Sequence, residues 1–362
     1  MISIIMTIRQ TASRFLVLSL TVLQIFAASG NAQTRSTLIK NATIIDGSGK
    51  PSFRGDVRIR NGKIVKIGVI RASKNDEVID ATGLVLAPGF IDIHNHSESG
   101  LLREGTAANQ VSQGITTVLV GPDGGSPFPI KDYLAKLDRK IAVNVGAFIG
   151  HATVREEVMK SDYTRKATDD EIKQMAELVK QSMKEGAFGL SSGLEYDVGF
   201  SASTEELVAL SQVAAKHRGI YMTHMRDEEE GMVEAIRESI RIGREAKLPV
   251  QISHIKMGNR NVWGKSSEAI ALIEETRRSG FDITADAYPY TAWASTITVL
   301  VPSRKHDDRA EVEKGLSNVG GADKVLVTNC PAHRDYEGKT LEQIAASQNT
   351  TPVDVYIQIV KD

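Results

Sequence analysis

Short apolar segments alternate with helical patterns through most of the chain. Segments of strand length occur at residues 91–94, 116–120, 143–149, 188–191, 220–224, 250–254 and 283–286. Amphipathic stretches lie between them, two of which begin with capping boxes at residues 168–171 and 203–206 and stop at Gly186 and Gly219. Such alternation indicates a parallel sheet, and polar residues at the strand ends favour a barrel over an open sheet. The pattern therefore predicts an α/β fold with seven strands of a TIM-like (β/α)8 barrel.

Residues 37–88 follow a different pattern, in which strand-like segments succeed one another without helices. TLIKNATIID and DVRIRNGKIVKIG alternate apolar and polar residues, and Asn61-Gly62 is typical of a two-residue hairpin turn. Three or four strands bury little surface alone and need a partner. We expect residues 37–88 to form the N-terminal part of a small β-sandwich.

The chain after Tyr290 is mixed, and helical patterns return only in LEQIAASQ and PVDVYIQIVKD. A complete barrel has eight strands, and no eighth segment follows the seventh. We therefore expect residues 89–362 to form an incomplete barrel, with the chain truncated at Asp362 and the eighth strand missing.

Residues 1–32 have the pattern of a cleaved secretory signal peptide. Arg9 and Arg14 precede the apolar run at residues 15–28, and small residues occur at 30–32. About fourteen apolar residues are fewer than the roughly 20 that span a bilayer. We expect export to the bacterial periplasm, with no stable membrane insertion after cleavage.

Composition narrows the range of partners. The 362 residues carry a net charge of −1 and are 41% hydrophobic, an ordinary balance for a chain with a large core. Lys and Arg are dispersed among acids, which argues against nucleic acid as a partner. Cys330 is the single cysteine, so no intramolecular disulfide can form. The oligomeric state stays open.

The candidate chemistry begins in GFIDIHNH, residues 89–96. His94 and His96 lie two apart, so on a strand both imidazoles point to the same face and can converge on one ion. A histidine beside an apolar strand is more often a hydrogen-bonded core residue. His224 and His254, however, each end another apolar segment, and histidines at three strand ends indicate a metal site.

With GFIDIHNH, GLSSGLEY, YMTHMRDE, QISHIKM and DAYPY, the chain from Thr37 onward resembles the amidohydrolase superfamily. Within it, the sequence is most similar to the D-aminoacylases, or N-acyl-D-amino-acid deacylases. This resemblance implies a distorted barrel whose β-sandwich comes from both ends of the chain. It also implies one or two divalent ions, usually Zn²⁺, with His94 and His96 at one position and His224 and His254 at the other.

The metal-binding carboxylate has two candidates. Many D-aminoacylases place a cysteine after strand 2, where this chain has Pro122-Asp123-Gly124. We prefer Glu195 as the bridging ligand, because it follows strand 4 and its two oxygens can span two metals. Asp123, at the place of that cysteine, is the lesser candidate, and the alternative is that its side chain only shapes the turn.

The resemblance further implies a small-molecule substrate, with contacts at Tyr196, Lys256 and Tyr288. It also implies a catalytic aspartate at the end of strand 8, which no residue of this chain matches, and we do not assign that role to Asp286. Arg226 is either a clamp for the substrate carboxylate or a salt-bridge partner of the acidic residues 227–230, and we favour the salt bridge. His151 and Arg155 follow strand 3, from which they could reach the mouth of the barrel.

Three functions remain in competition. The leading hypothesis is metal-dependent hydrolysis of N-acyl-D-amino acids, in which activated water attacks the amide. The second is a cyclic amidase or β-aspartyl dipeptidase of the same superfamily, against which Glu195 argues because those relatives carry a carboxylated lysine after strand 4. The third is an inactive, truncated remnant that binds metal or nothing.

Overall fold

The computed structural model describes residues 35–362, which divide between Gly89 and Phe90 into two compact units. The expected signal segment, residues 1–32, lies outside the described residues. No helix among residues 35–362 is both long and apolar enough to cross a membrane. Each unit is described by itself.

The first unit is a five-stranded sheet in the order β3-β2-β1-β4, with β5 also paired to β1. Asn61 and Gly62 have φ of 50° and 70° and join two antiparallel strands, so the predicted hairpin is confirmed. Ala42, Ile44 and Val57 form part of a small core. The strands are β1 Ser36–Ile44, β2 Phe53–Arg60, β3 Lys63–Gly68, β4 Asp76–Asp80 and β5 Val85–Leu86.

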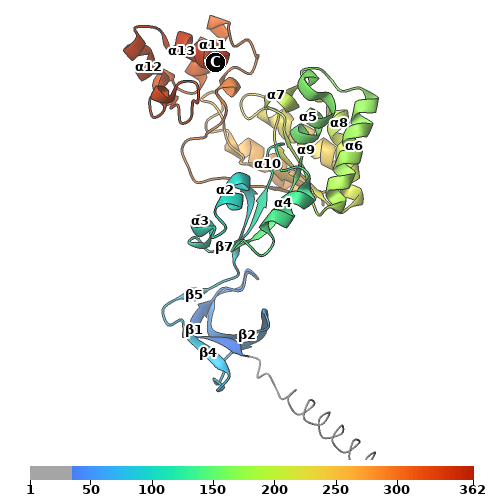
Figure 1. Ribbon diagram of the computed structural model, residues 1–362, viewed down its shortest axis with the longest axis vertical. Helices are drawn as coiled ribbons and strands as arrows, with labels where there is room; N and C mark the ends of the chain where they lie inside the picture. Colours follow the sequence, from blue (N-terminus) through green and yellow to red (C-terminus); the bar gives the residue numbers. More distant parts are fainter. Residues whose placement is uncertain (1–34) are drawn as a thin grey trace, which may run out of the picture. The chain divides into compact units, whose positions relative to one another are not determined.

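The second unit contains a series of parallel strands (Figure 1). Phe148 separates β8 from β9; β8 pairs with β7 and β9 pairs with β10, so the two pieces act as one strand that links both sheets. The predicted seven strand segments are therefore all present in the described chain. They are β6 Phe90–Asn95, β7 Ile115–Val120, β8 Asn144–Ala147 with β9 Ile149–Gly150, β10 Gly189–Gly193, β11 Ile220–His224, β12 Val250–Ile252 and β13 Ile283–Ala285.

Helices follow these strands, and α6, α8 and α9 lie side by side (Figure 1). Their apolar faces join the strands in one large core that includes Met175, Leu207 and Ile236. The helices are α2 Glu98–Arg103, α3 Ala108–Val111, α4 Ile130–Leu137, α5 His151–Met159, α6 Asp169–Lys184, α7 Asp197–Phe200, α8 Thr204–Lys216, α9 Met232–Ala246 and α10 Ser266–Arg278, with the 3-10 turn Lys160–Asp162.

The two predicted capping boxes differ in outcome. Thr168 and Glu171 cap α6 reciprocally, as expected. At α8 only half of the box forms, because Ser203 accepts from the backbone of Glu206 while the Glu206 carboxylate binds Arg155 and His151 instead. This second prediction is half right, since a tertiary ion pair replaces the local hydrogen bond.

The C-terminal part of this unit is helical and has a core of its own. Leu316, Leu341 and Tyr356 belong to this core. Its elements are α11 Arg309–Asn318, α12 Leu341–Gln348 and α13 Pro352–Lys361, with 3-10 turns at Ile297–Leu300, Ala322–Lys324 and Arg334–Tyr336. The expected barrel over residues 89–362 therefore ends near residue 286, and a helical cluster follows it in the described chain.

Candidate metal centre

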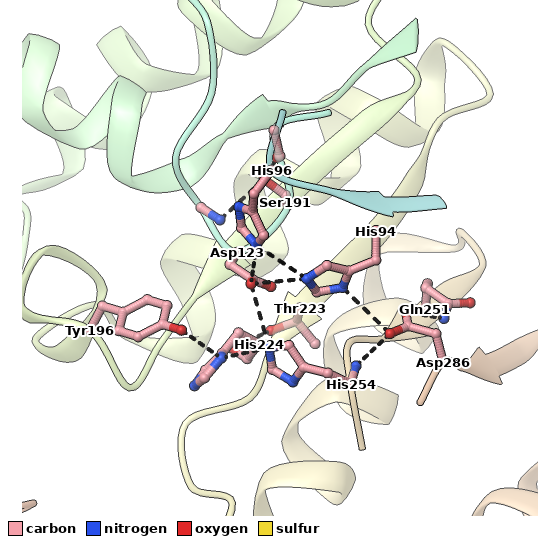
Figure 2. Close-up of polar contacts among 12 residues, drawn as sticks. His94, His96, Asp123, Ser191, Tyr196, Thr223, His224, Gln251, His254 and Asp286 are labelled. Atoms are coloured by element: carbon pink, nitrogen blue, oxygen red, sulfur yellow. Dashed lines mark hydrogen bonds and ion pairs between the residues drawn. The ribbon is translucent and has the colours of Figure 1, made fainter. Parts of the chain in front are cut away.

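Four histidines gather at the carboxyl ends of three strands and the loops that follow (Figure 2). His94 and His96 come from the end of β6, and their Nε2 atoms lie 3.3 Å apart, as the two-residue spacing predicted. His224 is the last residue of β11, and its Nδ1 lies 2.9 Å from Nε2 of His254. The four rings therefore form two pairs that face a common centre.

Asp123 occupies this centre. Its Oδ2 lies 3.2 Å from Nε2 of His94, 3.2 Å from Nε2 of His96 and 3.4 Å from Nε2 of His254. One carboxylate oxygen thus reaches both histidine pairs. The sequence had favoured Glu195 for this position and had kept Asp123 as the lesser candidate.

The loop after β7 holds Asp123 in a left-handed conformation with φ of 57°. Ser191 in β10 fixes the loop from one side, because its Oγ donates to the Gly121 carbonyl (2.6 Å) and accepts from Gly124 N (3.3 Å). From the other side, the Gly121 amide donates to Glu98 Oε1 (2.8 Å). A Cβ at Gly124 would lie 2.7 Å from Gly193 N, so glycine is required there. The backbone is held so that the Asp123 side chain points at the histidines.

Glu195 lies beside this centre and contacts a single histidine of the described chain. Its Oε2 is 2.7 Å from Nε2 of His224, on the opposite side of that ring from His254. Two further carboxylates are placed in the same way. Asp286 Oδ1 is 3.4 Å from Nδ1 of His94, and Glu228 Oε1 is 3.0 Å from Nδ1 of His254. Three histidines therefore each have a carboxylate within 3.4 Å of a ring nitrogen, and a carboxylate that accepts from a ring N–H can fix the tautomer of a metal ligand.

Sequence reasoning missed Glu228, which it grouped with the acidic residues 227–230 as a partner of Arg226. Arg226 does form a salt bridge, but its predicted partner is wrong. Its guanidinium binds Glu238 (2.9 Å) and the carbonyls of Phe200 and Ala202. The available signal was the position of Glu228 four residues after a strand-end histidine, but an acid in a run of four acids does not stand out.

At this centre, hydrogen bonds and nearby charges shift the pKa values in the direction opposite to the effect of burial. Burial alone would lower the histidine pKa values, yet hydrogen bonds and charges from Asp123, with Asp286 or Glu228, raise the pKa of His94 to about 10 and that of His254 to about 9. Burial would likewise raise the pKa of Asp123, but hydrogen bonds from His254, His94 and His96 hold it well below its usual range. Protons and metal ions compete for the same ring nitrogens, so metal binding at this centre would release protons.

The donors fit a divalent metal. Two groups, His94 with Asp123 and His254, and His224 with Glu228 and His254, each offer ligand atoms within 4.8 Å of one another. Asp123 Oδ1 is buried and has no hydrogen-bond partner in the described chain. Imidazole nitrogens and carboxylate oxygens are donors that suit zinc, and cobalt, manganese or nickel can use them as well.

The three expected substrate contacts surround the same centre. Tyr196 OH lies 3.0 Å from Nδ1 of His224. Lys256 Nζ is 2.9 Å from Nδ1 of His254 and 5.9 Å from the centre of the Tyr288 ring. The Tyr288 hydroxyl is buried without a hydrogen-bond partner among residues 35–362.

The sequence had suggested that His151 and Arg155 could reach the mouth of the barrel. They do not. Both are fully buried, and they enclose the carboxylate of Glu206 at 2.8 Å and 2.6 Å. Arg155 also donates to the carbonyl of Tyr163 (3.1 Å). These residues belong to the packing of α5 against α8.

Comparison with known proteins gives concordant matches. Residues 77–353 match the profile described as the amidohydrolase family. The D-aminoacylase of Alcaligenes xylosoxydans xylosoxydans is 34% identical over 91% of this chain and 69% of its own length. The chain thus spans about two thirds of that relative.

Solved structures agree with this match. A D-aminoacylase structure with a binuclear metal center matches with a TM-score of 0.78 and 34% identity, over 89% of this chain and 69% of that one. The N-acyl-D-glutamate deacylase from Bordetella bronchiseptica, complexed with zinc and a phosphonate mimic of the tetrahedral intermediate, matches with a TM-score of 0.79 and 30% identity, over 90% and 70% of the two chains.

Proposed function

The chain belongs to the amidohydrolase family, and from that premise we propose that the protein is a metal-dependent hydrolase that cleaves the amide bond of N-acyl-D-amino acids. The observation that carries this proposal is the position of Asp123 Oδ2, within 3.4 Å of imidazole nitrogens from both histidine pairs. The D-aminoacylase and N-acyl-D-glutamate deacylase relatives supply the substrate class.

In this proposal one histidine pair would bind metal on each side of a shared carboxylate. His94 and His96 would hold one position, His224 and His254 would hold the other, and Asp123 would serve both. Glu195 orients His224 from behind. The chemistry that a divalent ion supplies in such a site is polarisation of the amide carbonyl and a lowered pKa of the attacking water.

The remaining residues bind the substrate. Lys256 presents an ammonium group to the substrate carboxylate, and Tyr288 has a buried hydroxyl free to donate a hydrogen bond. Burial and the charge of Glu228 raise the pKa of Tyr288 to about 12, so the phenol keeps its proton at neutral pH. Tyr196, whose pKa is also raised by burial, donates in the same way beside His224.

Asp286 is not proposed to carry a proton. Its Oδ1 accepts from the backbone of His254 (2.6 Å) and its Oδ2 accepts from Gln251 Nε2 (2.8 Å). Both oxygens are engaged in holding the centre together, so Asp286 is better suited to supporting the His254 backbone, which has a φ of 34°.

The test is hydrolysis by the zinc-loaded protein of N-acetyl-D-amino acids beside their L-enantiomers, hydantoins and β-aspartyl dipeptides. We expect turnover of the N-acetyl-D-amino acids, its loss on treatment with a chelator, and its return with Zn²⁺. Turnover of the cyclic amides alone would replace the proposed activity with the competing one, and a protein that binds zinc without hydrolysing any of these would be the inactive remnant.

We also propose export to the periplasm, supported by the charged and apolar pattern of residues 1–32. Cell fractionation together with the N-terminal sequence of the natural protein tests this. Protein retained in the cytoplasm with an intact Met1 contradicts it.

A further inference from the structure

Glu228 lies behind the metal centre, four residues after His224 in the loop between β11 and α9. Its side chain is buried, and the residue is only 5% exposed. The two carboxylate oxygens face different partners: Oε1 is 3.0 Å from His254 Nδ1, and Oε2 forms the closest contact to Lys256 Nζ. One acid therefore joins a proposed metal ligand to a proposed substrate-binding residue.

Two other acids of residues 227–230, Asp227 and Glu230, have separate tasks. Asp227 accepts from the backbone amides of Glu229 and Gly231. Glu230 accepts from the side-chain amides of Asn259 (3.0 Å) and Asn261. Neither carboxylate contacts a histidine or a lysine of the described chain, so the role of Glu228 is specific to its position.

The tautomer of His254 requires an acceptor at Nδ1. Nε2 of His254 faces Asp123 and His224, so this nitrogen would bind a metal and must be free of a proton. A neutral imidazole then carries its proton on Nδ1. Lys256 Nζ lies 2.9 Å from Nδ1 but is only a donor and cannot accept that proton. Glu228 Oε1 is buried, lies 3.0 Å from Nδ1 and otherwise lacks a hydrogen-bond partner in the described chain, so it is the acceptor within reach.

We propose that Glu228 is a positioning residue with two effects, an inference that rests on the proposed function. First, it accepts the Nδ1 proton of His254, so that Nε2 is free to face the metal. Second, it holds the ammonium group of Lys256 on the side where substrate binds. Carboxylates behind metal-binding histidines commonly orient the ring and increase its basicity. Here the Glu228 carboxylate also fixes the position of Lys256, and therefore the place where the substrate carboxylate binds.

The surroundings of Glu228 are rigid enough for this role. Its carbonyl accepts from Gly258 N (2.8 Å), and the Gly258 carbonyl accepts from Trp293 Nε1 (3.2 Å). A Cβ at residue 258 would lie 2.8 Å from the Glu228 carbonyl oxygen, so the two loops are in direct contact. Supporting groups fixed in this way hold a site more precisely than groups on loose loops.

Two substitutions separate the two effects. Glu228→Ala removes both, and we expect Zn²⁺ affinity to fall roughly 10–100-fold, measured by competition with a chromophoric chelator. Glu228→Gln keeps an oxygen that can accept from Nδ1 but loses the charge that holds Lys256. For Glu228→Gln we expect Zn²⁺ affinity within a few-fold of the wild type and a raised KM for N-acetyl-D-amino acids.

Controls make the result decisive. Glu230→Gln changes the same charge in the same loop and should leave Zn²⁺ affinity unchanged. Glu228→Ala leaves the Lys256 charge without its partner, which could itself impair folding. The double variant Glu228→Ala/Lys256→Met removes both charges. We expect the double variant to fold and still to bind Zn²⁺ weakly. The inference is overturned if Glu228→Ala and Glu228→Ala/Lys256→Met bind Zn²⁺ as tightly as the wild type. It is also overturned if Glu228→Ala and Glu228→Gln lose the same amount of Zn²⁺ affinity. A wild-type protein that binds no Zn²⁺ overturns the proposed function as well.

Discussion

Two buried carboxylates of the second unit, Asp123 and Glu206, have similar neighbours but different means of charge compensation. Asp123 contacts three histidines and Glu206 contacts one, and both carboxylates have a pKa held below its usual range. Glu206 is paired with Arg155, whose Nη1 lies 2.6 Å from both oxygens, so its partner carries a permanent charge. Asp123 faces three imidazoles, and its Oδ1 has no hydrogen-bond partner in the described chain.

This difference separates a structural ion pair from a metal site. The cluster at Glu206 is electrically complete, because an arginine stays charged at any physiological pH. The cluster at Asp123 is balanced only by groups that lose their charge by releasing protons, and a divalent cation can replace those protons. A buried acid surrounded by histidines without an arginine is therefore the better candidate for a cation site.

The largest expected effect lies at the structural cluster. Glu206→Gln leaves the Arg155 guanidinium buried without a counterion, and we expect the free energy of unfolding to fall by about 3–5 kcal/mol. Urea denaturation with zinc present measures this. Glu205→Gln is the matched control, since that neighbouring side chain is 69% exposed, and it should leave stability nearly unchanged. If Glu206→Gln also empties the metal site while the fold persists, the two clusters are not separate.

The next effect is at the centre itself. Asp123→Asn removes the shared charge, and we expect the loss of metal affinity to exceed the roughly 10–100-fold typical of supporting residues. Metal content after dialysis, measured by elemental mass spectrometry, tests this. Thermal unfolding of the variant should remain cooperative, and the exposed Asp138→Asn should retain full metal content. Retention of both ions by Asp123→Asn would show that another carboxylate is shared.

Glu195→Gln tests whether Glu195 orients His224 or bridges two metals. If Glu195 only orients His224, metal affinity falls by roughly 10–100-fold and the number of ions at saturation is unchanged. If Glu195 bridges two metals, as the sequence had suggested, the number of ions at saturation falls. Titration of the metal-free variant with Zn²⁺ distinguishes the two outcomes.

Acid titration should show the smallest effect. The folded pKa of Glu206 is lowered below the ordinary 4.5, despite burial, by His151 and Arg155. The unfolded chain therefore binds more protons, and the contribution of Glu206 to stability is complete above about pH 4.5 and declines as pH falls toward the folded pKa. The difference in unfolding free energy between wild type and Glu206→Gln should narrow over that range. A difference that widens on acidification would contradict the sign.

Local patterns were sufficient to predict the strands, the Asn61-Gly62 hairpin and the cap of α6, because each depends on neighbouring residues. The histidine pairs were predictable for the same reason, since strand alternation places His94 and His96 together. The central role of Asp123 was not, because it depends on a left-handed backbone held by Ser191, a residue of another strand. Glu206 was mistaken for a local cap because its partners lie on α5, about fifty residues earlier.

The parallel strands also bear on the order in which the molecule assembles. Every strand pairing in the second unit is parallel, so each requires a crossover and joins residues far apart in sequence, whereas the hairpin of the first unit forms from neighbours. Non-local pairings form slowly during folding. Because the donors around Asp123 come from separate strands, the site exists only after those pairings are complete. A metal ion can therefore stabilise the fully folded state, but it cannot bind to this site early in folding.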